Sequence, residues 1–545
     1  MHAGTDETIA PAVTRRAVDR FHTLDRETFD VIVVGAGTGG LTVAALLART
    51  GRSVLVLDQH SVAGGNATVF TRPGYAFDVG LHYLGDCGPD GGVPRILRAA
   101  GVEDVAFREM DPDGFDTLMF PDFTFRVPKG LDAYRARLVE RFPLDVKGID
   151  RYLDVLQAIW SFQGLGGGFA ASVTTLWRAR RAVPYLNATL QTLLDRCTRN
   201  TRLRAVLAGQ SGDYAEPPSR VSLVVHAMVV MGYLRGAYYP AGGGQVISDR
   251  LAGAIERHGG KILLSAPVTR IVIENGRAAG VEFESRHLGH RAVRAPVVIS
   301  DADVKETMLE LVGAQHLKAR TVARLYRYEM APALGVAYLG VKRNLHAAGV
   351  PNTNFWIHPS YDQEPVYADA RAGRFHPEPF CYVSIATLKD PDNRRSAPPG
   401  VANIELATVV PSQPEAWGTT PEEIVKGTYH DNPAYRRAKD AFAARLIATA
   451  DRVFPGLAKD VVFQDVSSPM THTRYTRSTG GTAYGIALIP SQSLFRRVGH
   501  VTDVPGLYLC GASTYTGHGI TGVMWSGVLA ASRIAGGKVL KEVMR

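Results

Sequence analysis

FDVIVVGAGTGGLTVAALLARTGRSVLVLD, residues 29–58, is the stretch of sequence that decides the fold. Its apolar run 31–34 leads directly into the glycine-rich loop 35–40, and small and apolar residues then repeat at helical spacing. A second run with strand character, 53–57, ends on Asp58. This order of strand, glycine loop, helix, strand and acid predicts an α/β fold that begins with a βαβ unit of the Rossmann type.

The glycines of this loop each have a physical reason to be glycine. Gly35 permits the tight turn, Gly37 lets the backbone approach a pyrophosphate, and Gly40 lets the helix and the strand pack closely. Backbone N–H groups and the positive end of the helix dipole then face the phosphates, and Asp58 can accept a hydrogen bond from a ribose hydroxyl. The unit therefore predicts a site for an ADP-containing cofactor.

The composition is that of a globular protein with a basic surface. The chain has 545 residues, of which 46% are hydrophobic and 21% charged, and a formal net charge of +9. Its length favours two intertwined domains. The charge favours an anionic partner, and because no basic run is dense enough for nucleic acid, we expect a membrane surface instead. The four cysteines are scattered without metal-ligand or disulfide spacing, which favours a reducing compartment and no metal site.

The sequence predicts peripheral rather than integral contact with a membrane. Residues 1–28 lack the apolar core of a secretory signal and are interpreted as a loosely held extension. The longest strongly apolar stretch, 221–234, is shorter than the ~20 residues that span a bilayer, and is either a core helix or the wall of an apolar tunnel. Residues 177–181 have the composition of a membrane-surface contact or of a solvated basic face. We expect a cytoplasmic protein that contacts the inner face of the membrane.

The pattern along the chain changes several times, which predicts a cofactor-binding domain interrupted by two excursions. Asn275-Gly276, between two runs with strand character, predicts a hairpin turn. The expected segments are an N-terminal extension (1–28), three parts of the cofactor-binding domain (29–101, 236–304 and 456–545) and two parts of a substrate domain (102–235 and 305–455).

A second glycine-rich segment, 511–522, follows a short apolar run near the end of the chain and opens a helix. Many backbone N–H groups at a helix start favour negative charge, which a reduced flavin carries around its pyrimidine ring and a nicotinamide does not need. No second glycine fingerprint has the strand and helix context of an NAD(P) site. Electrons are therefore expected to come from the substrate or from an external donor or acceptor.

Together these motifs resemble one family. Residues 35–40, the pair Gly64-Gly65, the string 77–83 (Phe-Asp-Val-Gly-Leu-His-Tyr), the turn 239–243 and the segment 511–522 are similar to those of carotenoid desaturases, carotenoid isomerases and retinol saturases, which are FAD-dependent oxidoreductases. The resemblance covers nearly the whole chain after residue 28. The 77–83 string is closest to the retinol saturase and carotenoid isomerase branch.

This resemblance implies a fold and a binding site. The fold is a Rossmann-type FAD-binding domain of p-hydroxybenzoate-hydroxylase-like topology with an inserted α+β substrate domain, and a long apolar tunnel ends at the flavin. The residues that it assigns to FAD are Gly35, Gly37, Thr38, Gly39, Gly40, Asp58, Gly64, Gly65, Asn66, His82, Val268, Gly511, Ala512, Gly519, Ile520, Thr521 and Gly522. Asp58 stands where a glutamate is common, a shorter acid that still reaches a ribose.

The chemistry needs few charged side chains from the protein. Flavin N5 supplies the hydride-accepting centre that a carbon–carbon bond requires, and a polyene ion is stabilised mostly by its own delocalisation. The candidates for a proton donor or an orienting group are His82, Tyr83, Tyr515 and His518, each of which can equally be a hydrogen-bonded structural residue.

The leading hypothesis is an FAD-dependent oxidoreductase that desaturates, saturates or isomerises a long apolar polyene or isoprenoid. One alternative is an amine-oxidase-like flavoprotein, which holds its amine in an aromatic cage. Another is a non-catalytic lipid-binding protein on the same scaffold, although a carrier has no need of the glycines and Asp58. The sequence leaves the substrate, the direction of the reaction and the oligomeric state open.

Overall fold

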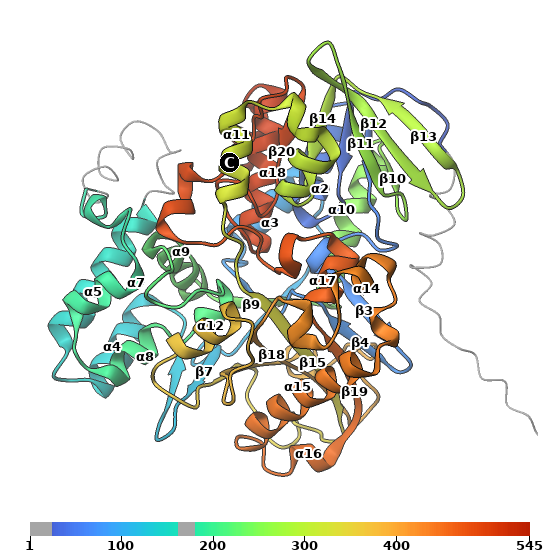
Figure 1. Cartoon of the computed structure of the whole chain (residues 1–545). Helices are drawn as coiled ribbons and strands as arrows, with labels where there is room; N and C mark the ends of the chain where they lie inside the picture. The colour runs from blue at the N-terminus through green and yellow to red at the C-terminus, as the bar shows by residue number, and fades with distance from the viewer. Residues whose placement is uncertain (1–23, 162–179, 545) are drawn as a thin grey trace, which may run out of the picture.

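The computed structural model describes residues 24–161 and 180–544 and contains two large sheets (Figure 1). Most of the expected extension 1–28, and Trp177 of the basic stretch, lie outside the described residues. The first sheet has five strands in the order β10-β2-β1-β14-β20, and all neighbours are parallel. Its strands are β1 (Val31–Val34), β2 (Val54–Leu57), β10 (Lys261–Leu263), β14 (Val297–Ser300) and β20 (Leu507–Leu509). The carboxyl ends of the strands therefore meet at one edge, where α/β sheets bind ligands.

The helices pack closely against this sheet and against each other, because glycines at their contacts leave room for the neighbouring backbone. α2 (Thr38–Ala48) is buried along its whole length and contacts both α10 (Gln245–Arg257) and α18 (Ile520–Ala535). A Cβ atom at Gly40 would lie 2.2 Å from the carbonyl oxygen of Gly35, and one at Gly527 of α18 would lie 2.8 Å from that of Gly39. No side chain fits at either distance, so the close helix packing depends on glycine at both positions.

A three-stranded antiparallel sheet packs beside the parallel one. It consists of β11 (Val268–Glu274), β12 (Arg277–Ser285) and β13 (Gly289–Arg294). The predicted hairpin turn between β11 and β12 is confirmed, since Asn275 and Gly276 both have positive φ angles, 50° and 73°. Ile271 and Val281 of this sheet share one buried cluster with Ile32, Leu55 and Val298 of the parallel sheet.

The second large sheet has seven strands in the order β19-β15-β18-β17-β16-β7-β8. Its strands are β7 (Asp116–Met119), β8 (Thr124–Val127), β15 (Ala333–Val341), β16 (Asn354–Ile357), β17 (Cys381–Ile385), β18 (Ala402–Val410) and β19 (Val461–Ser467). β7 and β16, more than 200 residues apart in sequence, pair in parallel with Asp116 opposite Asn354. β19 begins after the boundary expected at residue 455, and it pairs with the edge of β15 that would otherwise be unpaired.

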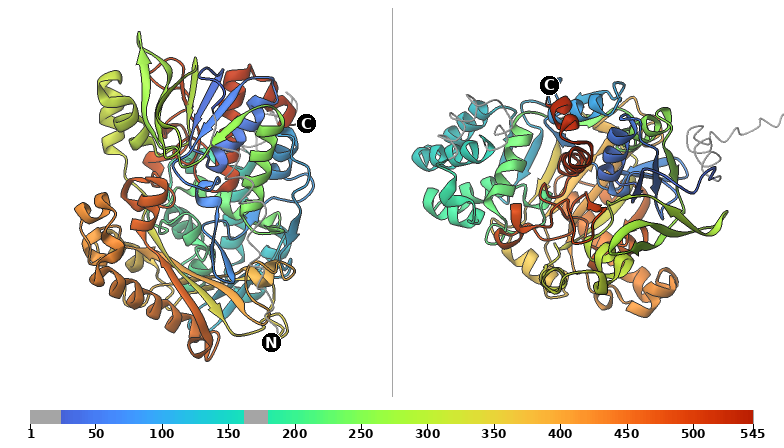
Figure 2. Two further views of the ribbon diagram at one scale, coloured as in Figure 1. Left: turned by 90° about the vertical axis from the view of Figure 1, so that its right-hand side faces the viewer. Right: turned by 90° about the horizontal axis from the view of Figure 1, so that it is seen from above.

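The two large sheets occupy different halves of the molecule (Figures 1 and 2). α15 (Pro433–Asp451) packs against β15, β17, β18 and β19. A group of helices lies to one side of β7 (Figure 1): α4 (Leu131–Arg141), α5 (Val146–Trp160), α7 (Leu190–Cys197), α8 (Thr201–Leu207) and α9 (Leu223–Leu234). α9 contains most of the apolar stretch 221–234, and its core residues join the buried cluster of this half. Within the described ranges, no helix has both the length and the apolarity to cross a membrane.

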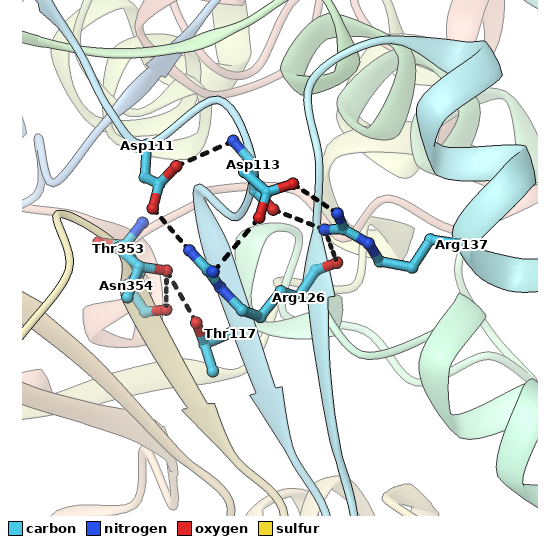
Figure 3. Close-up of polar contacts among 7 residues, drawn as sticks. All are labelled: Asp111, Asp113, Thr117, Arg126, Arg137, Thr353 and Asn354. Atoms are coloured by element: carbon cyan, nitrogen blue, oxygen red, sulfur yellow. Dashed lines mark hydrogen bonds and ion pairs between the residues drawn. The ribbon is translucent and has the colours of Figure 1, made fainter. Parts of the chain in front are cut away.

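The β7–β8 hairpin is fixed by polar contacts at its outer side (Figure 3). The guanidinium groups and carboxylates that form an ion-pair network there belong to Asp111, Asp113, Arg126 and Arg137. Because Asp113 is exposed and the other three side chains are only partly buried, water screens the network, which orients the hairpin more than it stabilises the fold. The hydroxyls of Thr117 and Thr353 lie 3.0 Å apart across β7 and β16. These contacts fix the position of the neighbouring Asp116, which is important for the site.

A small sheet, β5-β9-β6, joins the two halves. Its strands are β5 (Leu84–Gly85), β6 (Phe107–Glu109) and β9 (Ala237–Pro240), and β9 lies in the centre and pairs with both neighbours. The string 77–83 ends directly before β5. This sheet therefore positions His82 and Tyr83 between the parallel sheet and the seven-stranded sheet.

Candidate functional site

Two glycine loops meet at the carboxyl edge of the parallel sheet. Gly37 and Gly64 form a backbone bridge, and the N–H of Gly64 donates to the carbonyl of Ala36 at 2.7 Å. A Cβ atom at Gly65 would lie 3.2 Å from the Cα of Gly37. The structure thus brings Gly64 and Gly65 beside the first loop, where Thr38 begins α2 and Asn66 follows the second glycine pair.

We call the glycine loops 35–40, 64–66 and 511–522, together with the acids beside them, the cradle. The first of these acids is Asp58, at the end of β2. Its carboxylate accepts from the backbone N–H of Ala36 at 2.6 Å and of His60 at 2.7 Å. Burial raises the pKa of Asp58, and the two backbone donors act in the opposite direction. Val268, the first residue of β11, is buried close by, since the N–H of Ala266 donates to the carbonyl of Asp58.

Asp301 is a second acid in the cradle, and sequence reasoning missed it. It directly follows β14, and Cβ atoms built at Gly37 and Gly511 would each lie 2.3 Å from one of its carboxylate oxygens. Burial raises its pKa to about 7, while a hydrogen bond from the backbone of Gly40 lowers it. The signal was present in the sequence, because an acid after a buried strand of a parallel sheet lies at the ligand-binding edge.

Three polar atoms of the cradle lack a hydrogen-bond partner in the part of the chain that the structure describes. They are the hydroxyls of Thr38 and Thr516 and the side-chain oxygen of Asn66. A buried polar atom without a partner costs free energy, so a polar ligand is the natural partner for each. The glycine loops, Asp58 and these free atoms together fit the pyrophosphate, ribose and polar flavin edge of FAD.

A buried arginine, Arg497, donates hydrogen bonds to the backbone of the closing loop 511–522. Arg497 donates to the carbonyl of Ala512 at 2.6 Å and to that of Thr514 at 2.9 Å. Burial lowers the pKa of Arg497 to about 10, and within residues 24–161 and 180–544 no carboxylate forms an ion pair with it. The loop ends at Gly519, the N-cap of α18, so Ile520, Thr521 and Gly522 form the first turn of that helix. Arg497 was not foreseen.

His82 belongs to a buried cluster of ionisable groups. Its Nδ1 lies 2.7 Å from Oε2 of Glu405 on β18, and the other oxygen of Glu405 accepts from the backbone N–H of Asp78 at 2.9 Å. Lys389 donates to the carbonyl of His82 at 2.6 Å. Burial and the charge of Glu405 raise the pKa of Asp78 to about 6, and burial lowers the pKa of Lys389 to about 8. Asp78 also accepts from the hydroxyl of Tyr239.

Tyr83 connects two further carboxylates that the sequence did not reveal. Its hydroxyl lies 2.8 Å from Oδ2 of Asp213 and 3.1 Å from Oδ2 of Asp116. Nε2 of His518 lies 2.7 Å from the backbone carbonyl of Asp213, and burial lowers the pKa of His518 to about 4. The neutral ring therefore donates through Nε2. Two of the candidate catalytic residues, Tyr83 and His518, thus meet at Asp213.

Aromatic rings form one wall around Tyr83. Tyr233 stacks on it with ring centres 4.2 Å apart, and Tyr382 lies 6.3 Å away and also contacts His82. Tyr484 packs against the ring of His518 at 4.2 Å.

Tyr515 does not join this group. Its ring contacts Phe495 and His500 on the outside of the closing loop, and 37% of its surface is exposed. The structure therefore brings three of the four candidates together, and places the fourth at the surface.

Comparisons with known proteins agree with this geometry. A family model described as flavin containing amine oxidoreductase matches residues 38–535. All-trans-retinol 13,14-reductase of Danio rerio is 28% identical over 512 residues, which cover 89% of this chain and 82% of that protein. Prolycopene isomerase 1, chloroplastic, of Oncidium hybrid cultivar is 27% identical over 529 residues, which cover 94% and 84%. The crystal structure of an oxidoreductase from Methanosarcina mazei superposes with a TM-score of 0.62 at 18% identity, covering 93% of this chain and 99% of that one, and so shares its fold.

Proposed function

The chain belongs to the flavin-containing amine oxidoreductase family, and from this premise we propose that it acts on the carbon–carbon double bonds of a long polyene, of the retinoid or carotenoid class. It is an FAD-dependent oxidoreductase. The observation that carries the substrate class is that a retinol reductase and a prolycopene isomerase both match nearly the whole chain. Saturation, desaturation and cis–trans isomerisation all remain within this proposal.

The residues of the cradle bind and orient the cofactor. Thr38 and the glycine loops would bind the pyrophosphate, and Asp58 would orient the ribose through the carboxylate that also accepts from Ala36. Arg497 holds the closing loop, and the start of α18 that follows this loop would favour the negative charge of a reduced flavin. FAD, when bound, supplies the centre that accepts or gives a hydride.

The substrate side supplies apolar surface and positioned protons. The rings of Tyr83, Tyr233 and Tyr382 form a largely buried aromatic layer that excludes water from this part of the site. We assign proton-handling and orienting roles to His82, Tyr83 and His518. Tyr83 and His518 are hydrogen-bonded to Asp213, and Nδ1 of His82 lies 2.7 Å from a carboxylate oxygen of Glu405.

We further propose that the protein takes its substrate from an anionic membrane surface. Supporting this, exposed basic and aromatic side chains lie together near the closing loop. We call them the basic aromatic surface: Arg320, Tyr326, Arg327, Phe495 and Arg496. α11 (Ala319–Arg327) contacts the 494–497 segment through Arg324, which donates to the carbonyl of Arg496. Basic charge beside exposed aromatic rings is typical of a membrane contact, and it supports the proposal that the protein binds the anionic cytoplasmic face of a membrane.

The substrate proposal is tested with purified protein reconstituted with FAD. All-trans-retinol and prolycopene are supplied in detergent micelles, with and without chemically reduced flavin, and the products are separated by chromatography. We expect a new polyene isomer, or a product that differs by two hydrogens. A flavin-loaded protein that converts neither compound would contradict the proposed substrate class.

An amine substrate is the second candidate, favoured by the matching family model, whose description is flavin containing amine oxidoreductase. The distinguishing measurement is hydrogen peroxide release in air with a panel of primary and secondary amines. Peroxide release with amines, together with no change in the polyenes, would establish this alternative.

A further inference from the structure

One hydroxyl lies between two carboxylates at the centre of the site. Asp116 is on β7, Asp213 ends the 3₁₀ turn η4 (Ser211–Asp213), and Tyr83 comes from the segment before β5. The hydroxyl of Tyr83 contacts Oδ2 of both, at 3.1 Å and 2.8 Å. A hydroxyl has only one proton, so it can donate to one carboxylate at a time.

The surroundings of the two carboxylates differ. Asp116 is fully buried and accepts from the amide of Asn354 at 3.0 Å and from that of Gln210 at 2.5 Å. For Asp213, Tyr83 is the single hydrogen-bonding side chain that contacts its carboxylate in the described part of the chain. Burial, and next the nearby charge of Asp116, raise the pKa of Asp213 well above its usual value. Two donors stabilise the charge on Asp116, so the proton shared by the pair resides on Asp213.

With this proton on Asp213, every group has a partner. The carboxylic acid of Asp213 donates to the oxygen of Tyr83, and the hydroxyl of Tyr83 donates to Asp116. The result is a directed chain of hydrogen bonds that ends at a neutral acid. As a residue, Asp213 is less buried than Asp116 and Tyr83, so the acid lies at the less buried end of the chain of hydrogen bonds.

The acid also lies beside the cofactor loop and the aromatic wall. Its backbone carbonyl accepts from His518, directly before α18, and the carbonyl of the preceding Gly212 accepts from the hydroxyl of Tyr484 at 3.1 Å. Tyr233, also half-buried, stacks on Tyr83. A flat conjugated chain that packs against the half-buried ring of Tyr233 would lie near Asp213, because Tyr83, on which Tyr233 stacks, is hydrogen-bonded to Asp213.

We propose that Asp213 is the general acid and base of the site, which protonates a conjugated carbon of the substrate and later takes a proton back. The inference rests on the proposed polyene substrate. In the forward step the O–H bond of Asp213 breaks, and two π electrons of the polyene form the new C–H bond. The positive charge spreads over the remaining double bonds, and Tyr83 turns its hydroxyl from Asp116 to the new carboxylate.

The reverse step restores the enzyme without net change in electrons. After rotation about the adjacent carbon–carbon bond, which has lost double-bond character, the carboxylate of Asp213 removes a proton from the same carbon. The C–H electrons re-form the π bond, and Tyr83 returns to Asp116. Either hydrogen on that carbon can leave, so hydrogen from the solvent enters the product.

The experiment measures this exchange in the holoenzyme. Prolycopene and all-trans-retinol are incubated in deuterated buffer with FAD-loaded wild-type protein, and deuterium in the recovered polyene is measured by mass spectrometry. We expect deuterium incorporation in the wild type and a loss on the order of a hundredfold in Asp213→Asn, the usual contribution of a general acid or base. Asp195→Asn, an exposed carboxylate in α7, is the control for the change in charge and is expected to behave as wild type.

Each outcome has one meaning. Incorporation by Asp213→Asn at the wild-type rate, with unchanged flavin content, overturns the inference and leaves the proposed substrate class intact. A flavin-loaded wild type that leaves both polyenes unchanged contradicts the proposed substrate class itself. If Asp213→Asn does not retain FAD, Tyr83→Phe decides, because it keeps the acid and removes only the bridging proton. Slow exchange in Tyr83→Phe supports the inference, and wild-type exchange in it overturns the inference, because the proposed step requires the hydroxyl of Tyr83 to stabilise the new carboxylate of Asp213.

Discussion

At the scale of single residues, the cofactor cradle contains an acid, Asp301, that its glycine motifs do not predict. Asp301 lies against the glycines of both loops, and burial raises its pKa to about 7 from 3.8. The folded apoprotein therefore retains a proton that the unfolded chain releases near pH 4. We expect the contribution of Asp301 to the free energy of unfolding to fall by on the order of 4 kcal/mol as pH rises from about 4 to about 7, and to stay constant above.

Urea unfolding of the apoprotein at pH 5 and pH 8 checks this expectation. Asp301→Asn cannot titrate, so the difference between wild type and this variant isolates Asp301 from the other acids in the fold. The variant is expected to lose less stability than wild type between the two pH values. An equal loss in both proteins would mean that Asp301 does not hold a proton in the fold.

Whereas Asp301 is expected to affect the pH dependence of stability, Asp58 is expected to affect the affinity for FAD. Its removal in Asp58→Ala leaves the N–H groups of Ala36 and His60 without their acceptor and would remove the contact proposed for the ribose. We expect the Kd for FAD to rise tenfold to a hundredfold, that is about 1.4 to 2.8 kcal/mol, as measured by flavin fluorescence on titrating the apoprotein. Asp58→Glu restores the acid and should bind nearly as tightly as wild type.

Asp30→Ala is the matched control for Asp58. It removes a carboxylate from the same βαβ unit that accepts from the backbone of Ser53 at 2.7 Å, at the end of the sheet away from the cradle. Its Kd should match that of wild type. If Asp58→Ala and Asp30→Ala bind FAD equally well, Asp58 does not contact the cofactor.

At the scale of elements, the packing of α2 against α18 depends on glycine. In Gly527→Ala, the new methyl group would lie 2.8 Å from the carbonyl oxygen of Gly39 and 3.0 Å from Cβ of Thr42, and neither neighbour can move without shifting a helix. We expect a loss of about 1 to 3 kcal/mol in the free energy of unfolding, with weaker FAD binding because the cradle lies between these helices.

Gly253→Ala is the paired substitution in α10, where the nearest atom to the new methyl group is the guanidinium of Arg257 at 3.4 Å. There the general preference of helices for alanine applies, and we expect a gain of up to about 1 kcal/mol. Chemical denaturation of both variants gives the comparison. Equal stability changes in the two variants would contradict the role of Gly527 in helix packing.

The elements also show what the sequence could and could not predict. The Rossmann-type fold is confirmed, because its signals are local: the apolar run of β1, the glycine loop and Asp58 lie within 30 residues. The site acids come together only through pairing of distant strands, as when β7 brings Asp116 opposite Asn354 of β16. The sequence does mark Glu405 as unusual, because it is the single charged residue inside the buried strand β18. Its partner His82 could not be predicted without knowing how the strands are arranged in space.

At the scale of the whole molecule, the basic aromatic surface and the site lie on opposite sides of one loop. Tyr515 and Phe495 contact each other on the outside of the closing loop, whereas His518 of the same loop faces Asp213. Arg497 links the two sides, since it donates to the carbonyls of Ala512 and Thr514 beneath the loop. An apolar substrate that leaves a membrane at this surface would therefore enter the site close to the cofactor. It would cross only a short distance of water between the membrane and the site.

Vesicle binding tests this arrangement. Phe495 is 82% exposed, and Phe495→Ser removes an apolar ring from the basic aromatic surface without removing a buried contact. We expect it to weaken co-sedimentation with vesicles of mixed phosphatidylcholine and phosphatidylserine by roughly tenfold, about the free energy of burying such a side chain. Binding by wild type should also fall in high salt, because the arginines act through charges that salt screens.

Val425→Ser, at an 89% exposed position in α14 (Pro421–Lys426), is the control, and it should bind as wild type does. If Phe495→Ser binds these vesicles as tightly as Val425→Ser, the membrane contact lies elsewhere on the protein, and the path from the surface to Asp213 loses its support.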